Sequence, residues 1–326
     1  MAQSSPNLPE QLDRHQVSVY LGAMVAGAVV GWSVSGSGSV LAALINPALG
    51  ALLYVTFLQV PAADLGRAFR DHRFIAALIL LNFVVVPVVV GGLFTFLPSE
   101  QAVRVGVLLV LLCPCVDYVI VFAGLAGGSR QRLIAATPIL LLLQMALLPF
   151  YLWLFMGPDL TDVVDNRPFV EAFLYLIAVP LALAWATQWA ANRATVIRRF
   201  EDGATAVMVP LMAVVLFAVV GSQLPELDGL DRDVVAVVPV YVIFLVVMAG
   251  AGMLVSALFS LDAAGRRSVV FSGATRNSLV VMPLALALPA GYEVAAVVVV
   301  TQTLVEIIGM TVYVKVIPRL VPARTV

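Results

Sequence analysis

The side chains with the clearest chemical capacity lie together in a short interruption of an apolar run. Cys113, Pro114, Cys115 and Asp117 fall inside a hydrophobic segment of about residues 102–126, and the chain has only two cysteines. A thiol binds soft, thiophilic species, and a carboxylate can exchange a proton. Because proline removes a backbone donor and clashes with the preceding turn, we expect a helix to bend or break here.

A second polar interruption lies at residues 271–278 and contains Arg276. An arginine at the centre of a membrane helix costs about 2.5–3.5 kcal/mol on insertion scales, so it needs a partner or water. Asp117 and Glu306 are the only carboxylates well inside apolar segments. We therefore expect Asp117 to be the counter-charge of Arg276 if the two interruptions cross.

The composition is that of a multi-pass membrane protein. Of the 326 residues, 62% are hydrophobic and 11% are charged, whereas about 25% are charged in soluble domains. Apolar runs near 20 residues recur along the chain, and each is long enough to cross a bilayer. The net charge of -1 gives no indication of nucleic-acid binding. The first 15 residues do not resemble a signal peptide, so we expect the first span to be retained.

These runs predict an all-α fold of ten spans in one membrane domain covering residues 1–326, with no separate soluble domain. The predicted spans run at about 17–33, 39–60, 74–96, 103–126, 133–156, 168–190, 204–222, 234–259, 268–289 and 292–316.

The basic residues indicate the orientation of these spans. With the N-terminus in the cytoplasm, fourteen of the 18 basic residues lie on cytoplasmic segments and three lie outside, with Arg276 within a span. Such a bias is typical of membrane proteins, whose cytoplasmic loops are rich in Lys and Arg. We therefore expect both termini in the cytoplasm and the protein in the inner (plasma) membrane.

Ten spans divide into two halves of five, at about residues 17–156 and 168–316, which must enter the membrane in opposite directions. Weak internal similarity, such as Pro47 and Pro210 in spans 2 and 7, favours an inverted repeat. Inverted repeats with interrupted helices at matching positions are typical of secondary transporters with a site at the midplane.

Residues 112–115, 274–278 and 283–289 resemble the bile acid/sodium symporter superfamily, and within it the arsenical-resistance (arsenite efflux) permeases. The resemblance implies ten helices in two inverted five-helix repeats, with helices 4 and 9 broken and crossing at the centre. It also implies that a core domain moves against a panel domain. In the arsenite branch a Pro-Cys pair carries the thiol needed for transport, and Cys115 occupies that position.

Three positions depart from the family pattern. By the same resemblance, Ser272 stands where the sodium symporters have a sodium-binding glutamate, and Arg276 stands where they have a glutamine. A fixed cation opposes sodium binding, so we expect protons rather than sodium to be the coupling ion. Leu279 stands where the arsenite permeases carry a glutamate, and we hypothesise that Asp117 has taken over that role.

We therefore predict a secondary active antiporter that exports arsenite, or a related trivalent metalloid, in exchange for entering protons. It would need no cofactor or metal ion, and its partners would be the small substrate and the lipid bilayer. The predicted substrate-binding residues are Cys115, Cys113, Asn277, Thr275, Asn82 and Gln302, with Gln144 and Thr301 as further hydrogen-bonding groups; the predicted coupling residues are Asp117, Arg276 and Glu306.

Alternatives remain open at this point. Arg276 could instead hold the carboxylate of an organic anion bidentately, or form a purely structural pair with Asp117. Cys113 could serve only in packing, and Glu306 could cap a polar seam with Gln302 one turn away. A receptor that has lost turnover is a further alternative. We expect no enzymatic activity, because no nucleophile, base and orienting group cluster in the sequence.

Overall fold

The fold is all-helical throughout the part of the chain that the structure, a computed structural model, describes. The described part contains no strand, only one isolated bridge, and four of its helices are long and apolar enough to cross a membrane. The protein is thus a multi-pass membrane protein. The described residues are 8–34, 36–58, 71–116, 118–157, 179–191, 193, 203–204, 207–223, 231–286, 288–289 and 291–322.

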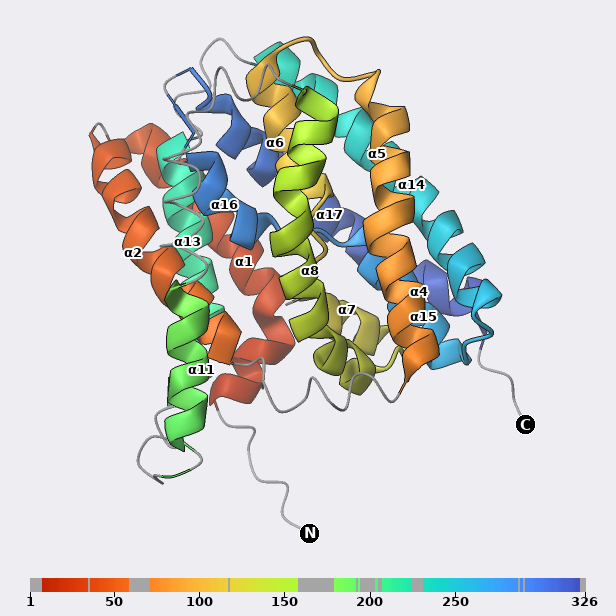
Figure 1. Cartoon of the computed structure of the whole chain (residues 1–326). Coiled ribbons are helices and arrows are strands. Elements are labelled where there is room, and N and C mark those ends of the chain that lie inside the picture. The colour runs from red at the N-terminus through yellow and green to blue at the C-terminus, as the bar shows by residue number, and fades with distance from the viewer. Residues whose placement is uncertain are drawn as a thin grey trace. The chain divides into compact units, whose positions relative to one another are not determined.

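Helices lie along all ten predicted segments, although the number that cross a membrane stays a prediction. The four long apolar helices are His72–Phe94, Arg130–Met156, Val234–Leu258 and Val294–Leu320. The helices are α1 (Leu8–Ser33), α2 (Ser37–Leu58), α4 (His72–Leu80), η2 (Leu81–Val85), α5 (Val86–Phe94), α6 (Gln101–Leu111), α7 (Tyr118–Leu125), α8 (Arg130–Met156), α11 (Val179–Ala191), α13 (Met208–Gln223), α14 (Asp231–Leu258), α15 (Ala263–Ala274), α16 (Ser278–Leu286) and α17 (Val294–Leu320) (Figure 1).

The chain divides into two compact units, each built from both halves of the sequence. Unit 1 comprises Met1–Gln59 and Glu171–Gly229, and unit 2 comprises Val60–Val170 and Leu230–Val326. Within unit 1, α13 packs against α1 and α2, and α11 packs against α2. Within unit 2, α14 packs against α15 and α17, while α6 and α16 pack against α17. Unit 2 contains all the predicted site residues.

Small residues allow the helices of unit 2 to approach closely. A Cβ atom added to Gly106 on α6 would lie 2.8 Å from the carbonyl oxygen of Ala295 on α17. Any larger residue would therefore force these two helices apart. Since α6 leads directly into the first interruption and α17 carries Gln302 and Glu306, this contact fixes part of the geometry of the predicted site.

The span His72–Phe94 contains a turn of π-helix, η2, that ends just before Pro87. Proline lacks the N–H that would bind the carbonyl of Phe83 four residues earlier. The hydroxyl of Tyr151 on α8 donates to that carbonyl at 2.6 Å instead. Asn82 lies within the π-helical turn and is completely buried. Such turns inside α-helices are frequent at functional sites.

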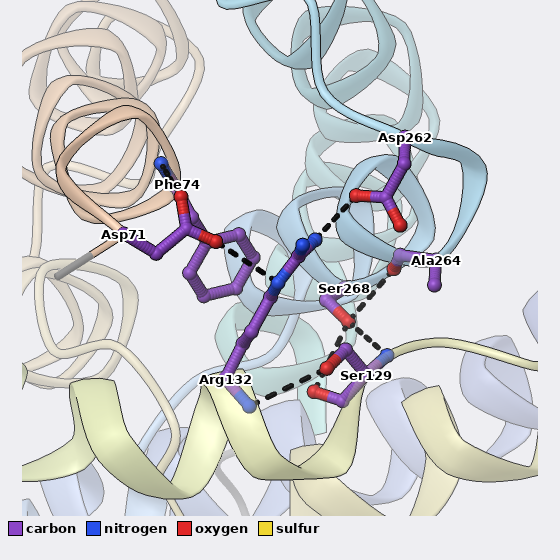
Figure 2. Close-up of polar contacts among 7 residues, drawn as sticks. All are labelled: Asp71, Phe74, Ser129, Arg132, Asp262, Ala264 and Ser268. Carbon is purple, nitrogen blue, oxygen red and sulfur yellow. Dashed lines mark hydrogen bonds and ion pairs between the residues drawn. The ribbon is translucent and has the colours of Figure 1, made fainter. Parts of the chain in front are cut away.

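One arginine joins the beginnings of three helices at one end of unit 2. Arg132 contacts Asp71, which caps α4, at 2.9 Å, and also contacts Asp262, which precedes α15 (Figure 2). Its guanidinium lies over the ring of Phe74. Ser129 caps α8 by accepting from the backbone N–H of Arg132. The negative caps and the helix N-termini stabilise one another, because each N-terminus carries a partial positive charge.

Candidate functional site

The two predicted interruptions are both breaks between helices, and their backbones pair with each other. The helix break predicted at Pro114 is confirmed, since α6 ends before it and α7 begins after it. The backbone N–H of Cys115 donates to the carbonyl of Thr275 at 3.1 Å, and that of Asn277 donates to the carbonyl of Cys113 at 2.8 Å. Each break thus supplies partners that the other has lost from its own helix.

Both thiols lie at this crossing. Cys113 and Cys115 are each only 1% exposed, and the two described cysteines form no disulfide with each other. The N–H of Cys115 and the carbonyl of Cys113 both take part in the backbone pairing, so the crossing fixes the backbone position of both cysteines. The sequence placed these thiols beside the second interruption only on the hypothesis that the interruptions cross.

The guanidinium of Arg276 is completely buried and is bound by oxygen atoms of the protein. Its Nη1 atom donates to the carbonyl of Leu111 at 3.1 Å. Its Nη2 atom lies 2.9 Å from Oδ1 of Asn82, 2.8 Å from the carbonyl of Ser272 and 2.7 Å from that of Gly273. Among the described carboxylates, none lies within 4.0 Å of this guanidinium.

Glu306 on α17 reaches the same crossing from another direction and is also completely buried. Its Oε2 atom accepts from the backbone N–H of Arg276 at 2.8 Å and also from the side-chain amide of Gln302. The hydroxyl of Tyr118 lies 2.6 Å from Oε1 of Glu306 and 3.0 Å from the carbonyl of Arg276. A hydroxyl has one proton, so it can donate to only one of these acceptors at a time.

Several buried polar atoms near the crossing are left without a hydrogen-bond partner in the described part of the chain. They are Nδ2 of Asn277, Oγ of Ser278, Oε1 of Gln302 and Nε of Arg276. Buried polar groups are usually satisfied, so a group of unpaired ones indicates a place for water or a polar ligand. Asn277 and Ser278 directly follow Arg276, and Gln302 is joined to it through Glu306.

Other predicted residues are engaged in holding the helices. The amide of Asn82 donates to the carbonyl of Leu78 and to the hydroxyl of Ser272, both at 3.1 Å, while its oxygen accepts from Arg276. Asn82 thus joins the π-helical turn to the second break. Its polar atoms are used by the protein itself.

The two predicted threonines bond within their own helices. Thr275 donates to the carbonyl of Phe271, and Thr301 donates to that of Val297, each at 2.9 Å. Gln144 on α8 is buried, and both of its side-chain polar atoms lack partners among the described residues.

Sequence reasoning gave no role to two residues of this arrangement. Tyr118 connects Glu306 to the second break, and Ser278 has a buried hydroxyl without a partner among the described residues. Both residues lie in or beside the interruptions, and that position is the sequence feature that could have identified them. Asp117 lies outside the described residues, so its pairing with Arg276 stays a prediction. No group of three or more metal-ligating side chains occurs in the described ranges.

Part of the chain matches a known protein family. The profile of the Sodium Bile acid symporter family matches residues 46–227, more than half of the chain. The chain belongs to the sodium/bile acid symporter family. The resemblance inferred from the sequence is thereby confirmed. The matched residues include the first interruption but end before the second.

One curated relative is the arsenical-resistance protein Acr3 of Corynebacterium glutamicum. It is 26% identical over 176 residues, which cover 49% of this chain and 48% of that protein. The match spans about half the length of that relative.

Proposed function

We propose that this member of the sodium/bile acid symporter family is a secondary transporter that exports arsenite or a related trivalent metalloid in exchange for protons. The observation that carries the proposal is the position of Cys115, whose thiol is held at the crossing of two broken helices. Family membership and the similarity to an arsenical-resistance protein support it.

A single thiol suits a substrate that must be released again. Trivalent arsenic is soft and thiophilic, which matches cysteine. The thiol of Cys115 exchanges with one hydroxyl of arsenite, so that one As–S bond forms, one As–O bond breaks and water leaves. The reverse reaction releases the substrate on the other side. Three thiols would hold arsenic too tightly for turnover, and the chain has only two.

The unpaired polar atoms at the crossing suit the remaining hydroxyls of the substrate. Asn277 offers an N–H donor, Gln302 offers an acceptor oxygen, and the hydroxyl of Ser278 can do either. Hydrogen bonds to these atoms would replace those that arsenite makes with water. Neutral donors and acceptors of this kind are compatible with a substrate that is uncharged at neutral pH.

Proton coupling runs through Glu306 in this proposal. As a carboxylate, Glu306 accepts from the backbone of Arg276, from Tyr118 and from Gln302. Protonation removes its negative charge and one of its acceptor positions, which weakens its hold on the second break and frees the proton of Tyr118 for the carbonyl of Arg276. Proton binding thus acts on the backbone that positions Asn277 and Ser278. A contribution from Asp117 remains part of the proposal.

The overall organisation we propose is ten spans in two inverted repeats, with both termini in the cytoplasm. Two features support it: helices lie along all ten segments, and each compact unit draws on both halves of the chain. The alternating movement of a core against a panel, implied by the family, stays a prediction.

Transport of an organic anion through Arg276 is less well supported. Both Nη atoms of its guanidinium already donate to protein oxygens, and the side chain is fully buried. A substrate carboxylate bound bidentately would have to displace these acceptors. The thiol at the crossing would also have no role.

The test is resistance to arsenite in a bacterial strain that lacks its own arsenite exporters. The wild-type protein should restore growth, and Cys115→Ser should reduce growth to that of the empty vector because the soft ligand is lost. Cys113→Ser should retain part of the resistance, because the proposal gives the arsenic–sulfur bond to Cys115 and not to Cys113. Immunoblots of membranes must show equal amounts of all three proteins.

Full resistance with Cys115→Ser would contradict the role of the thiol. Antimonite should behave as arsenite does, because it is also trivalent and thiophilic. The protein should confer resistance to arsenate only in cells that can reduce arsenate to arsenite.

A further inference from the structure

The buried guanidinium of Arg276 stands in an arrangement of oxygens that is unusual for an arginine. Four oxygens bind it at 2.7–3.1 Å: the carbonyls of Leu111, Ser272 and Gly273, and Oδ1 of Asn82. All four are formally neutral. Arginine buried in a protein is more commonly paired with a carboxylate, which here is absent within 4.0 Å among the described residues.

The three carbonyls are available because the helix breaks divert their usual donors. The carbonyl of Leu111 would bind the N–H of Cys115 four residues on, but that N–H donates to Thr275, and Pro114 has no N–H. The carbonyl therefore points its lone pairs at another donor. The same reasoning applies to both other carbonyls.

In α15 the expected donors to Ser272 and Gly273 are the N–H groups of Arg276 and Asn277. The first donates to Glu306 and the second to Cys113. Two carbonyls at the end of α15 and one at the end of α6 are thus left to accept from outside their helices. Helix C-termini carry partial negative charge, so these carbonyls favour a cation.

Unpaired carbonyls at the ends of broken helices, together with an amide oxygen, form the kind of site that holds a small monovalent cation in transporters. With no carboxylate among the four ligands, such a site has too little negative charge for a divalent ion. Here the positive charge among these oxygens is the guanidinium of Arg276, a residue of the same chain that lies about one turn after Ser272 and Gly273.

We propose that Arg276 is a tethered cation that occupies a monovalent-cation site made by Leu111, Ser272, Gly273 and Asn82, and that the protein therefore neither binds nor requires sodium. Removal of the guanidinium leaves an oxygen-lined site that sodium can enter. The inference deepens the proposed function, since it concerns the ion that accompanies the substrate. It rests on that function only for its consequence in transport.

The test measures thermal unfolding of the purified full-length protein in detergent, with sodium, lithium, potassium or choline chloride at one ionic strength. The wild-type Tm should be the same in sodium and in choline. Arg276→Gln, which removes the charge and adds an oxygen, should have a lower Tm in choline and gain roughly a few degrees with sodium, in a saturable manner.

Two matched variants control for the charge and for the loss of an arginine. Arg276→Lys keeps a cation in the site and should stay insensitive to sodium. Arg104→Gln removes a partly buried arginine that donates to the carbonyl of Pro98 and lies over the ring of Phe94, and this variant should also stay insensitive to sodium. A sodium effect in either variant would show that the response does not report on the empty site.

Saturable stabilisation of the wild-type protein by sodium would overturn the proposal, and this measurement needs no variant to fold. A folded Arg276→Gln protein that ignores all the metal cations would overturn it as well. Because the samples contain no metalloid, the Tm measurement tests the cation site even if arsenite is not the substrate. Equal arsenite efflux in sodium and choline media is the further expected result.

Discussion

At the scale of single residues, Arg276 has two separate functions in the structure. Its backbone N–H binds the carboxylate of Glu306, whereas its guanidinium binds neutral oxygens elsewhere. A change in the charge of Glu306 therefore acts on the second break directly through the backbone. The two buried opposite charges also balance each other within unit 2, which lowers the free-energy penalty of burying either one.

Glu306→Gln should abolish proton-driven transport while leaving exchange of substrate across the membrane. An amide keeps the shape and one acceptor oxygen but cannot take up a proton. The measurement is arsenite uptake into everted membrane vesicles, with and without an imposed pH gradient. We expect the pH-driven part to fall at least about tenfold, as for loss of a coupling group.

The control for this variant is Glu293→Gln, which removes an exposed carboxylate next to the start of the same helix, where it accepts from the backbone of Gly291. It should transport as the wild type does. If uptake by Glu306→Gln still responds fully to the pH gradient, Glu306 is not the coupling group.

The residues of the site were only partly predictable from the sequence. Cys115, Arg276 and Glu306 could be found because each is an unusual side chain in an apolar segment. The oxygens that bind Arg276 could not, because most are backbone carbonyls, which every residue has. The pairing of Asp117 with Arg276 stays a prediction, because Asp117 lies outside the described residues; the described residues show in addition that freed carbonyls bind the guanidinium.

At the scale of elements, the breaks follow from local chemistry but their partners do not. Pro114 was enough to predict the end of a helix, since its effect is on its own turn. Pro87 is a local signal that the carbonyl of Phe83 loses its donor, but the sequence does not show that Tyr151 from another helix donates to that carbonyl instead. Contacts between helices decide such features, and one sequence does not reveal them.

Gly106→Ala should destabilise unit 2 because α6 and α17 cannot separate without disturbing the site. The added Cβ would lie 2.8 Å from the carbonyl oxygen and 2.9 Å from the Cα atom of Ala295, both backbone atoms. Overpacking of this kind typically costs about 1–3 kcal/mol. The Tm of the purified protein should fall, and arsenite resistance should fall with it.

Gly250→Ala is the matched control for this change. Gly250 lies inside helix α14 and is exposed, and an added Cβ would meet nothing within 4 Å. Its Tm should stay equal or rise slightly, because alanine favours a helix over glycine. Equal Tm values for both variants would mean that α6 and α17 are not in tight contact.

At the scale of the whole molecule, the chain interleaves its two halves. Unit 1 and unit 2 each combine a segment from before residue 171 with one from after it. The sequence predicted an all-α membrane protein correctly, because hydropathy reports directly on the solvent of each segment. It could not show how the chain divides into units, since that depends on which helices pack together.

Both termini should lie in the cytoplasm. Fourteen of the 18 basic residues fall on the segments that this orientation places inside. A fluorescent protein fused to either end should be bright, and alkaline phosphatase fused at either end should be inactive. Active phosphatase at one end only would require an odd number of spans and would contradict the ten-span arrangement.

The pairing of the two breaks has a consequence for how the protein is made. The N–H of Cys115 and the carbonyl of Leu111 find their partners at Thr275 and Arg276, which leave the ribosome only after most of the chain has been synthesised. Until then the first break carries unmet backbone groups, which lipid cannot satisfy. The first break must therefore remain in contact with water or with the insertion machinery until residues 275 and 276 have been synthesised. A chain truncated before residue 275 should insert its first break into the bilayer only unstably.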